Sequence, residues 1–292
     1  MSLRLEMLQV ARLAPNQLRD SAALVRDFLL GQLNEDGGFA DRDGKSDLYY
    51  TVFGLEGLLA LQAELPVERV GRHLESFGDG DGLDLVHLAC LARSRADAGC
   101  LTESDAGRLA ARLGTFRSRD GGFHNEADAA TGTVYGCFLA VGAYQDLGVE
   151  PPEPGEIGDF LRSMETADGA YSNEKRMPQG STNATAAAVT LLRNLGRTNR
   201  PQVGDWLLQR WHEQGGFVAA PRAPLPDLLS TATTLHALSG LEVSFDQLKE
   251  PCLDFVNTLW SNKGSFYGHW ADDRLDCEYT YYGLLALGHL SL

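Results

Sequence analysis

Two kinds of apolar stretch take turns along the chain. The first kind carries charge on one face and includes 21–33, 102–116, 155–164, 201–211 and 245–260. The second kind is apolar nearly all round and covers 47–62, 84–92, 131–144, 181–195, 227–241 and 276–290. A half-charged helix lies at a surface, whereas a helix that is apolar on every side is normally buried on every side. The pattern therefore predicts outer helices that alternate with inner helices.

A turn of glycine and an aromatic residue follows most of the charged stretches. Gly37-Gly38-Phe39 recurs at 121–123 and 215–217, and in altered form at 168–171 and 264–266, while the second repeat has the glycine-rich segment 78–82. Glycine ends a helix by adopting positive φ, and we expect the aromatic residue to fill the hairpin. The turns divide the chain into six helical hairpins, at approximately 21–64, 66–98, 102–148, 153–197, 200–242 and 244–292.

Six hairpins can stack as an open solenoid or close into a ring. An open array would leave an apolar face exposed at each end, and the sequence shows no obvious capping repeat. We therefore predict one all-α domain over residues 1–292, an α/α toroid (α6/α6 barrel) with an inner and an outer ring of helices.

Charge and cysteine content exclude several kinds of partner and structural site. The formal net charge of −15 argues against nucleic acid and anionic membrane surfaces as general partners. Five cysteines without C-x-x-C spacing signal neither a disulfide framework nor a structural zinc site. Charged residues interrupt the apolar N-terminal residues, and no stretch has transmembrane character, so we predict a cytoplasmic protein without an integral membrane segment.

The six inner stretches can be aligned on one column of residues: Thr51, Leu88, Thr133, Thr185, Thr231 and Thr280. Four residues earlier the column holds Asp47, Asp84, Asp227 and Asp276, and helix N-capping accounts for these aspartates. Capping does not account for the unequal residues nearby, which are Arg42, Lys45, His87, His269, Arg274 and Glu278. Because these loops open at one end of a toroid, we expect them to surround one sector of the rim. Above an aromatic cavity, such a sector is typical of a site for an amphiphile with an anionic head.

Residues 37–61 resemble the catalytic repeat of protein prenyltransferase β subunits, whose pattern is G-G-F, then R-x-x-K, then D-x-C-Y-S-F-W. The resemblance implies that Arg42 and Lys45 bind an isoprenoid diphosphate, that Tyr50 contacts it, and that Phe53 lines the lipid pocket. Residues 276–282, D-C-E-Y-T-Y-Y, are a second match, in which His269 and Arg274 partly replace the basic pair. This match adds Tyr279 and Tyr282 to the expected substrate contacts, and Tyr49, in the cysteine position of the first match, is a further one.

The same resemblance implies a zinc site. Asp47 and His87 match two of the ligands of the family, and Asp276 and Glu278 are the corresponding acids of the sixth repeat. The cysteine that completes the site in the family is replaced by Tyr49 in the first repeat and by Glu278 in the sixth. Neutral tyrosine is a weak zinc ligand, so a zinc-free site stays open as an alternative.

Three functions are compatible with these residues. The first is a β-subunit-like prenyltransferase in which Asp47, Tyr50 and His87 are catalytic, with a helical-repeat α subunit or a peptide acceptor as partner. The second is a non-catalytic toroid that binds a lipid or a protein partner. The third is a zinc-independent terpenoid transferase or cyclase. Squalene-type cyclases, another branch of the superfamily that the chain resembles, protonate an alkene from the motif D-x-D-D-T-A. The nearest string in this chain, D-L-L-S-T-A at 227–232, has Leu229 and Ser230 as its central pair. This chain should therefore not be a protonation-initiated cyclase.

Overall fold

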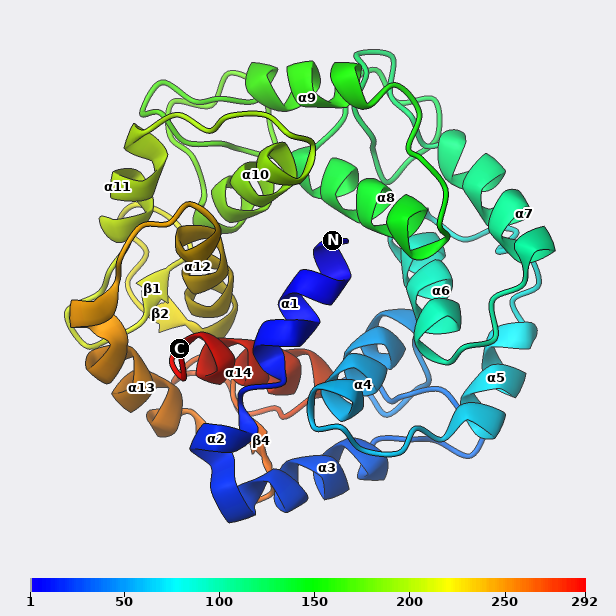
Figure 1. Cartoon of the computed structure of the whole chain (residues 1–292), viewed down its shortest axis with the longest axis horizontal. Coiled ribbons are helices and arrows are strands. Elements are labelled where there is room, and N and C mark those ends of the chain that lie inside the picture. Colours follow the sequence, from blue (N-terminus) through cyan, green and yellow to red (C-terminus); the bar gives the residue numbers. More distant parts are fainter. Residues whose placement is uncertain (1) are drawn as a thin grey trace.

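The computed structural model describes residues 2–292 and shows two concentric rings of helices (Figure 1). The outer ring consists of α3 (Ala22–Gly31), α5 (Val67–Glu75), α7 (Glu103–Gly114), α9 (Pro154–Ser163), α11 (Gln202–Leu208) and α13 (Lys249–Thr258). The inner ring consists of α4 (Leu48–Ala60), α6 (Leu85–Asp97), α8 (Val134–Asp146), α10 (Thr182–Asn194), α12 (Leu228–Gly240) and α14 (Cys277–His289). The last inner helix, α14, packs against the first, α4, as well as against α12. The ring is therefore closed, and the predicted toroid is confirmed.

Buried turn residues tie each outer helix to its inner partner. Phe39, Phe123, Tyr171, Phe217 and Phe266 are all buried. The amide of Phe39 donates to Thr51 Oγ1 at 3.0 Å, and the same bond joins Tyr171 to Thr185 and Phe217 to Thr231. Two hairpin turns also contain short antiparallel pairs, β1 (Phe217–Val218) with β2 (Pro226–Asp227) and β3 (Trp260–Ser261) with β4 (Ser265–Phe266). The aligned threonines Thr51, Thr185 and Thr231 therefore accept the hydrogen bonds that hold these turns against the inner helices.

The third repeat departs from the expected alignment by one helical turn. Thr133 is the N-cap of α8, and its amide donates to the carbonyl of Phe123 as the amide of Asp47 donates to Phe39. Thr133 therefore corresponds to Asp47 and not to Thr51. A threonine serves equally well as an N-cap and as a small buried residue, so the sequence alone does not distinguish the two registers. The correct register places Tyr135 at the position of Tyr49.

Helix α6 also extends further than its apolar pattern predicts. The stretch was expected to end at 92, but the helix continues to Asp97. Arg93 and Arg95 lie in this extension, and both side chains are largely buried in contacts with acidic or carbonyl groups. Buried ion pairs therefore replace apolar packing in the last turn.

An additional helix, α1 (Leu3–Ala11), crosses the middle of the ring (Figure 1). Leu3, Leu8 and Ala11 are buried, and α1 packs mainly against α14 and α4. Charged groups of α1 reach the last turns of the inner helices, where Arg4 pairs with Asp97 and Asp146. The helix therefore closes the end of the barrel at which the inner helices finish, and the rim lies at the other end, where they begin. Sequence analysis assigned no element to this segment.

Short elements complete the chain. Helix α2 (Pro15–Leu18) and the 3-10 turn η1 (Arg19–Ser21) connect α1 to α3, and the 3-10 turn η2 (Asp246–Leu248) precedes α13. Within residues 2–292, no helix combines the length and the apolar character that crossing a bilayer requires.

Candidate functional site

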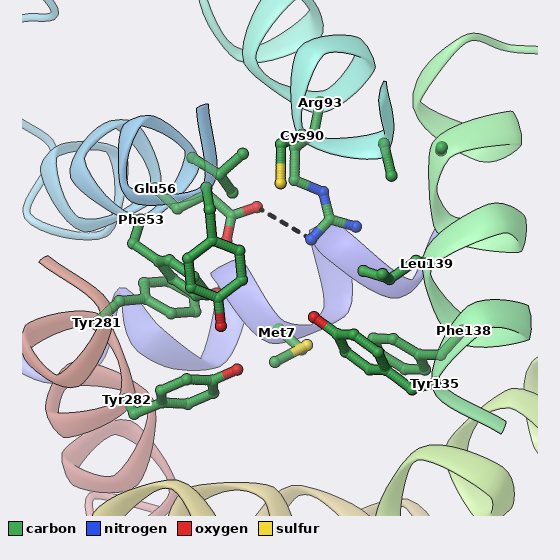
Figure 2. A pocket seen from close by; sticks show the side chains of 14 residues that line it. Met7, Phe53, Glu56, Cys90, Arg93, Tyr135, Phe138, Leu139, Tyr281 and Tyr282 are labelled. Atoms are coloured by element: carbon green, nitrogen blue, oxygen red, sulfur yellow. Dashed lines mark ion pairs between the residues drawn. The ribbon is translucent and has the colours of Figure 1, made fainter. Parts of the chain in front are cut away.

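A cavity with two adjoining lobes lies inside the inner ring, above α1. The larger lobe has a volume of about 260 Å³ and the smaller about 80 Å³. Both are lined by Met7, Tyr49, Tyr135, Phe138 and Tyr282. Figure 2 shows the smaller lobe. Met7 belongs to α1, so the additional helix forms the floor of the cavity.

Helical periodicity decides which side chains face this cavity. Three positions, counted from the N-cap of each inner helix, supply lining residues. The second position supplies Tyr49, Tyr135, Asn183 and Leu229, and the ninth supplies Glu56, Arg93, Thr190 and His236. The sixth position, between them, supplies Phe53, Cys90, Leu139, Ala187, Thr233 and Tyr282. Positions two, six and nine share one face of a helix with 3.6 residues per turn. The cavity is therefore built in three levels from the rim to the floor.

Aromatic rings concentrate on the side of α4 and α14. The ring centroids of Tyr49 and Phe53 are 4.9 Å apart, and Phe53 lies 5.8 Å from Tyr281 and 5.5 Å from Tyr282. The faces of aromatic rings attract cations, including a carbocation held against them. This wall suits a hydrocarbon ligand that develops positive charge.

The first and sixth repeats meet at the rim, as predicted. Arg42 Nε donates to Asp276 Oδ2 at 2.7 Å, and its terminal nitrogen lies 3.0 Å from Asp272 Oδ2. The guanidinium also lies over the ring of Tyr279, 5.3 Å from its centroid. Arg274 donates to the carbonyl of Arg42 at 3.0 Å. The positive charge of Arg42 is thus already balanced by two carboxylates.

His87 and Asp47 are also brought together. His87 Nδ1 lies 2.7 Å from Asp84 Oδ1, and Nε2 lies 3.6 Å from Asp47 Oδ2. The neighbouring carboxylate of Asp47, with a further contribution from Asp84, raises the pKa of His87 to about 9. The imidazolium is therefore the stable form at neutral pH, held between the N-caps of α4 and α6.

A hydrogen bond joins the second positions of α4 and α14. Tyr49 Oη donates to Glu278 Oε1 at 2.7 Å. Burial raises the pKa of Glu278 to about 7, and the nearby Asp276 acts in the same direction. A substantial fraction of Glu278 is therefore a neutral carboxylic acid at neutral pH, next to a tyrosine of the cavity wall.

The predicted zinc ligands are distributed among separate partners. Asp47 pairs with His87, Asp276 with Arg42, and Glu278 with Tyr49. In the part of the chain that the structure describes, no three His, Cys, Asp or Glu side chains are grouped as a metal site requires. The residues therefore do not fit a zinc ion as they stand, and no step proposed below uses one.

The other predicted substrate contacts lie at different depths. Phe53 and Tyr282 are in the cavity wall, and Tyr50 is half-buried at the rim, where burial and two nearby acids raise its pKa to about 12. Lys45 is exposed, and its ammonium group has no ion-pair partner among residues 2–292. His269 accepts a hydrogen bond from the amide of Ala271, within its own loop. The rim thus collects most of these residues, whereas Lys45 and His269 stand apart from the cavity.

The sequence did not predict the ninth-position residues of the cavity, nor Tyr135 among the second-position residues. Met7 could not be found because α1 was not predicted, and Tyr135 was hidden by the register of the third repeat. Glu56 carried a usable signal, since a single acid inside the otherwise apolar stretch 48–60 is unusual. Arg93, its partner on α6, lay beyond the predicted end of that helix.

The chain belongs to the prenyltransferase alpha-alpha toroid domain family, whose profile matches residues 5–90, 83–217 and 185–291. Among solved structures, it is similar to the type II terpene cyclase MstE from Scytonema in complex with geranylgeranyl dihydroxybenzoate, with 17% identity over 95% of this chain and 97% of that one and a TM-score of 0.63. Candida albicans protein geranylgeranyltransferase-I, complexed with GGPP, has 14% identity over 98% of this chain and 82% of that one, with a TM-score of 0.54. A protein from Actinoplanes has 17% identity over 93% and 98% of the two chains, with a TM-score of 0.58. No curated protein matches the sequence. At these identities the structural likeness establishes the fold.

Proposed function

We propose that the protein is an isoprenoid-converting enzyme, and that it acts as a cyclase which starts its reaction by protonating an alkene. The observation that carries this proposal is the 2.7 Å hydrogen bond that holds Glu278 against Tyr49 of the aromatic cavity wall. Glu278 is the third residue of Asp276-Cys277-Glu278-Tyr279-Thr280, which is the place of the first of the two central acids in D-x-D-D-T-A, whereas Tyr279 stands in the place of the second. On sequence alone the string at 227–232 in the fifth repeat is the nearest match to this motif, and there Leu229 stands at the same helical position as Glu278.

The surroundings of Glu278 suit an acid. Arg42 holds Asp276 through a 2.7 Å hydrogen bond, so Asp276 has a cation beside it while Glu278 has a neutral tyrosine. Burial raises the pKa of both carboxyl groups, and the hydrogen bond from Arg42 opposes this rise at Asp276, so Glu278 is the one that keeps its proton more readily. Glu278 would give that proton to one carbon of a double bond, and the π electrons form the new C–H bond. The cation that remains on the other carbon is stabilised by the rings of Tyr49, Phe53 and Tyr282.

The similar solved structures support an isoprenoid ligand. MstE is described as a type II terpene cyclase and was solved with a substrate that carries a geranylgeranyl group. Protein geranylgeranyltransferase-I was solved with a prenyl diphosphate. Both ligands contain an isoprenoid chain, and an aromatic cavity closed at one end fits such a chain.

Prenyl transfer is the second candidate, and Arg42 is the observation in its favour. Arg42 lies at the mouth of the cavity, next to Tyr279, in the position of the arginine of R-x-x-K. With Lys45 it would hold the diphosphate of a prenyl donor, and a helical-repeat α subunit or a peptide acceptor would be the partner. For this to happen, the diphosphate would have to displace Asp272 and Asp276 from the guanidinium. That requirement places transfer second.

Solvent deuterium separates the two reactions. The purified protein is incubated in D₂O with farnesol, geranylgeraniol and their diphosphates, and the products are analysed by mass spectrometry. Protonation of an alkene followed by loss of a different proton adds one carbon-bound deuterium per product molecule. Transfer to an acceptor instead releases diphosphate and leaves the carbon skeleton unlabelled. We expect labelled products, and we expect Glu278→Gln to abolish them while it retains substrate binding.

The remaining outcomes identify the alternatives. Diphosphate release to a thiol peptide that is lost in Arg42→Gln would replace the cyclase with a transferase. Tight binding of isoprenoids without any conversion would favour the non-catalytic toroid.

A further inference from the structure

The floor of the cavity carries charged groups that the proposed reaction does not use. Glu56 and Arg93 each occupy the ninth position after an N-cap, on the neighbouring helices α4 and α6, and both line the smaller lobe (Figure 2). Arg93 Nη1 lies 3.7 Å from Glu56 Oε1. Charged side chains on the wall of an otherwise apolar cavity usually serve to orient a ligand.

Behind this pair, Arg93 continues into a buried network. Its Nε donates to Asp146 Oδ2 at 2.9 Å, and the other oxygen of Asp146 accepts from Arg4 Nε of α1 at 3.0 Å. Arg4 also pairs with Asp97. The network therefore contains three carboxyl groups and only two guanidinium groups. It has no surplus positive charge with which to bind a further anion, so a diphosphate does not suit the floor.

Arg93 nevertheless has hydrogen-bond donors to spare. Neither of its terminal nitrogens makes a hydrogen bond within residues 2–292, and 18% of its side chain is exposed, against 3% for Glu56 and 1% for Asp146. The smaller lobe is the space that this exposed part faces. A guanidinium keeps five N–H donors in a fixed plane, and those that are unpaired inside a cavity favour an oxygen acceptor.

Two more polar atoms lie beside the lobe. Glu56 Oε1 and the hydroxyl of Tyr281 are both buried, and neither makes a hydrogen bond of ordinary geometry among the residues that the structure describes, although the two groups interact with each other. Buried polar atoms are nearly always paired, and unpaired ones call for an explanation such as a ligand. The donors of Arg93 and these two atoms belong to the same lobe.

From this geometry we infer that the floor is a subsite for an uncharged oxygen group, a hydroxyl or a carbonyl, at one end of the isoprenoid substrate. The inference rests on the proposed function and adds the class of substrate and its direction. The oxygen accepts a hydrogen bond from Arg93, the hydrocarbon chain lies along the aromatic wall, and the opposite end reaches the level of Tyr49 and Glu278. A charged head group would instead be left at the rim.

Binding selectivity tests the subsite without relying on turnover. Dissociation constants are measured by calorimetry for farnesol, for the hydrocarbon farnesene and for farnesyl diphosphate. The wild type should prefer the alcohol to the hydrocarbon by about tenfold, which is the scale of one hydrogen bond to a charged donor. Arg93→Met should remove this preference by weakening alcohol binding alone. Arg95→Met is the matched control, because Arg95 lies on the same helix and donates to backbone carbonyls of Leu74 and Gly78 outside the cavity.

A second variant guards against misfolding. Arg93→Lys keeps a cation beside Asp146 but loses the planar donors, so it too should lower the ratio of alcohol to hydrocarbon affinity. An unchanged ratio in a folded Arg93 variant overturns the subsite, as does a wild type that binds all three ligands equally. Failure to bind any isoprenoid overturns the proposed function as well. Selective binding with no deuterated product overturns only the role of Glu278 and leaves the subsite standing.

Discussion

Tyr49 and Glu278 are joined by a 2.7 Å hydrogen bond although 229 positions separate them in the sequence. The bond crosses the junction between the first and last inner helices, where the ring closes. A donor to the carboxylate stabilises its ionised form, so Tyr49 holds the pKa of Glu278 below the value that burial alone would give. The tyrosine thus sets the pH range over which the acid keeps its proton.

Replacing Tyr49 by Phe should extend activity to higher pH. If Glu278 must be protonated, the rate is present below its pKa and is lost as the pH rises through it. Loss of the Tyr49 hydroxyl removes the interaction that lowers this pKa, so the alkaline limb of the pH–rate profile should move upward. Tyr282→Phe is the control, since its hydroxyl lines the cavity without a hydrogen bond to Glu278. A limb that moves downward in Tyr49→Phe would contradict the role of Glu278 as an acid.

Helix α1 should contribute strongly to stability through one face only. Leu8 is 2% exposed, whereas Leu5 on the same helix is 41% exposed. Leu8→Ala should lower the free energy of unfolding by ~2–5 kcal/mol, and Leu5→Ala should change it by less than ~0.5 kcal/mol. Urea denaturation of both variants measures the difference. Equal effects would show that α1 does not pack as the floor of the barrel.

Two glycines with similar backbone angles should respond differently to alanine. Gly37 and Gly44 have φ values of +93° and +84°. A Cβ at Gly37 would stand 2.1 Å from the carbonyl oxygen of Arg69, whereas a Cβ at Gly44 would meet nothing within 4 Å. Gly44→Ala should therefore cost only the strain of positive φ, ~1 kcal/mol, and Gly37→Ala should cost clearly more. Thermal unfolding of the two variants decides this, and similar melting temperatures would contradict it.

A buried histidine pair should make a contribution to stability that is lost in mild acid. His236 Nδ1 and His289 Nε2 are 3.1 Å apart, and burial lowers the pKa of both, that of His236 to about 4. Glu6, which lies 3.7 Å from His236, acts in the opposite direction, and Arg193 acts with the burial. Between about pH 6.5 and pH 4 the unfolded chain binds protons that the folded chain does not. The contribution of the pair to the free energy of unfolding should therefore fall as the pH falls, by up to about 1.4 kcal/mol per pH unit for each such histidine, whereas Glu278, whose pKa is raised, contributes with the opposite sign over the same range.

Urea unfolding at pH 7.5, 6 and 5 measures this dependence. His289→Leu should reduce the slope because one of the two protons is no longer involved. His212→Gln, in a surface turn remote from the pair, serves as the control. A steeper slope in His289→Leu would contradict the assignment.

The fold could be predicted from the sequence because each of the six repeats carries the same pattern of outer and inner helix. One misaligned repeat, that of Thr133, did not change the predicted toroid. The site was less predictable, because each of its residues occurs in only one repeat. The meeting of Arg42 with Asp276 followed from closure of the ring, and Glu278 was singled out by its motif. The floor could not be predicted, because Arg4, Asp97 and Asp146 come from three distant segments and only folding brings their charges together.

The position of α1 also has a consequence for how the chain reaches its final shape. This helix is synthesised before the helices of the two rings, yet its largest set of contacts is with α14, the last of them in the sequence. Until α14 is available, the buried side of α1 has no complete partner, and the first and last inner helices cannot meet. Nascent chains that stop before residue 277 should therefore expose Leu3, Leu8 and Ala11, and they are the species that a molecular chaperone would have most reason to bind.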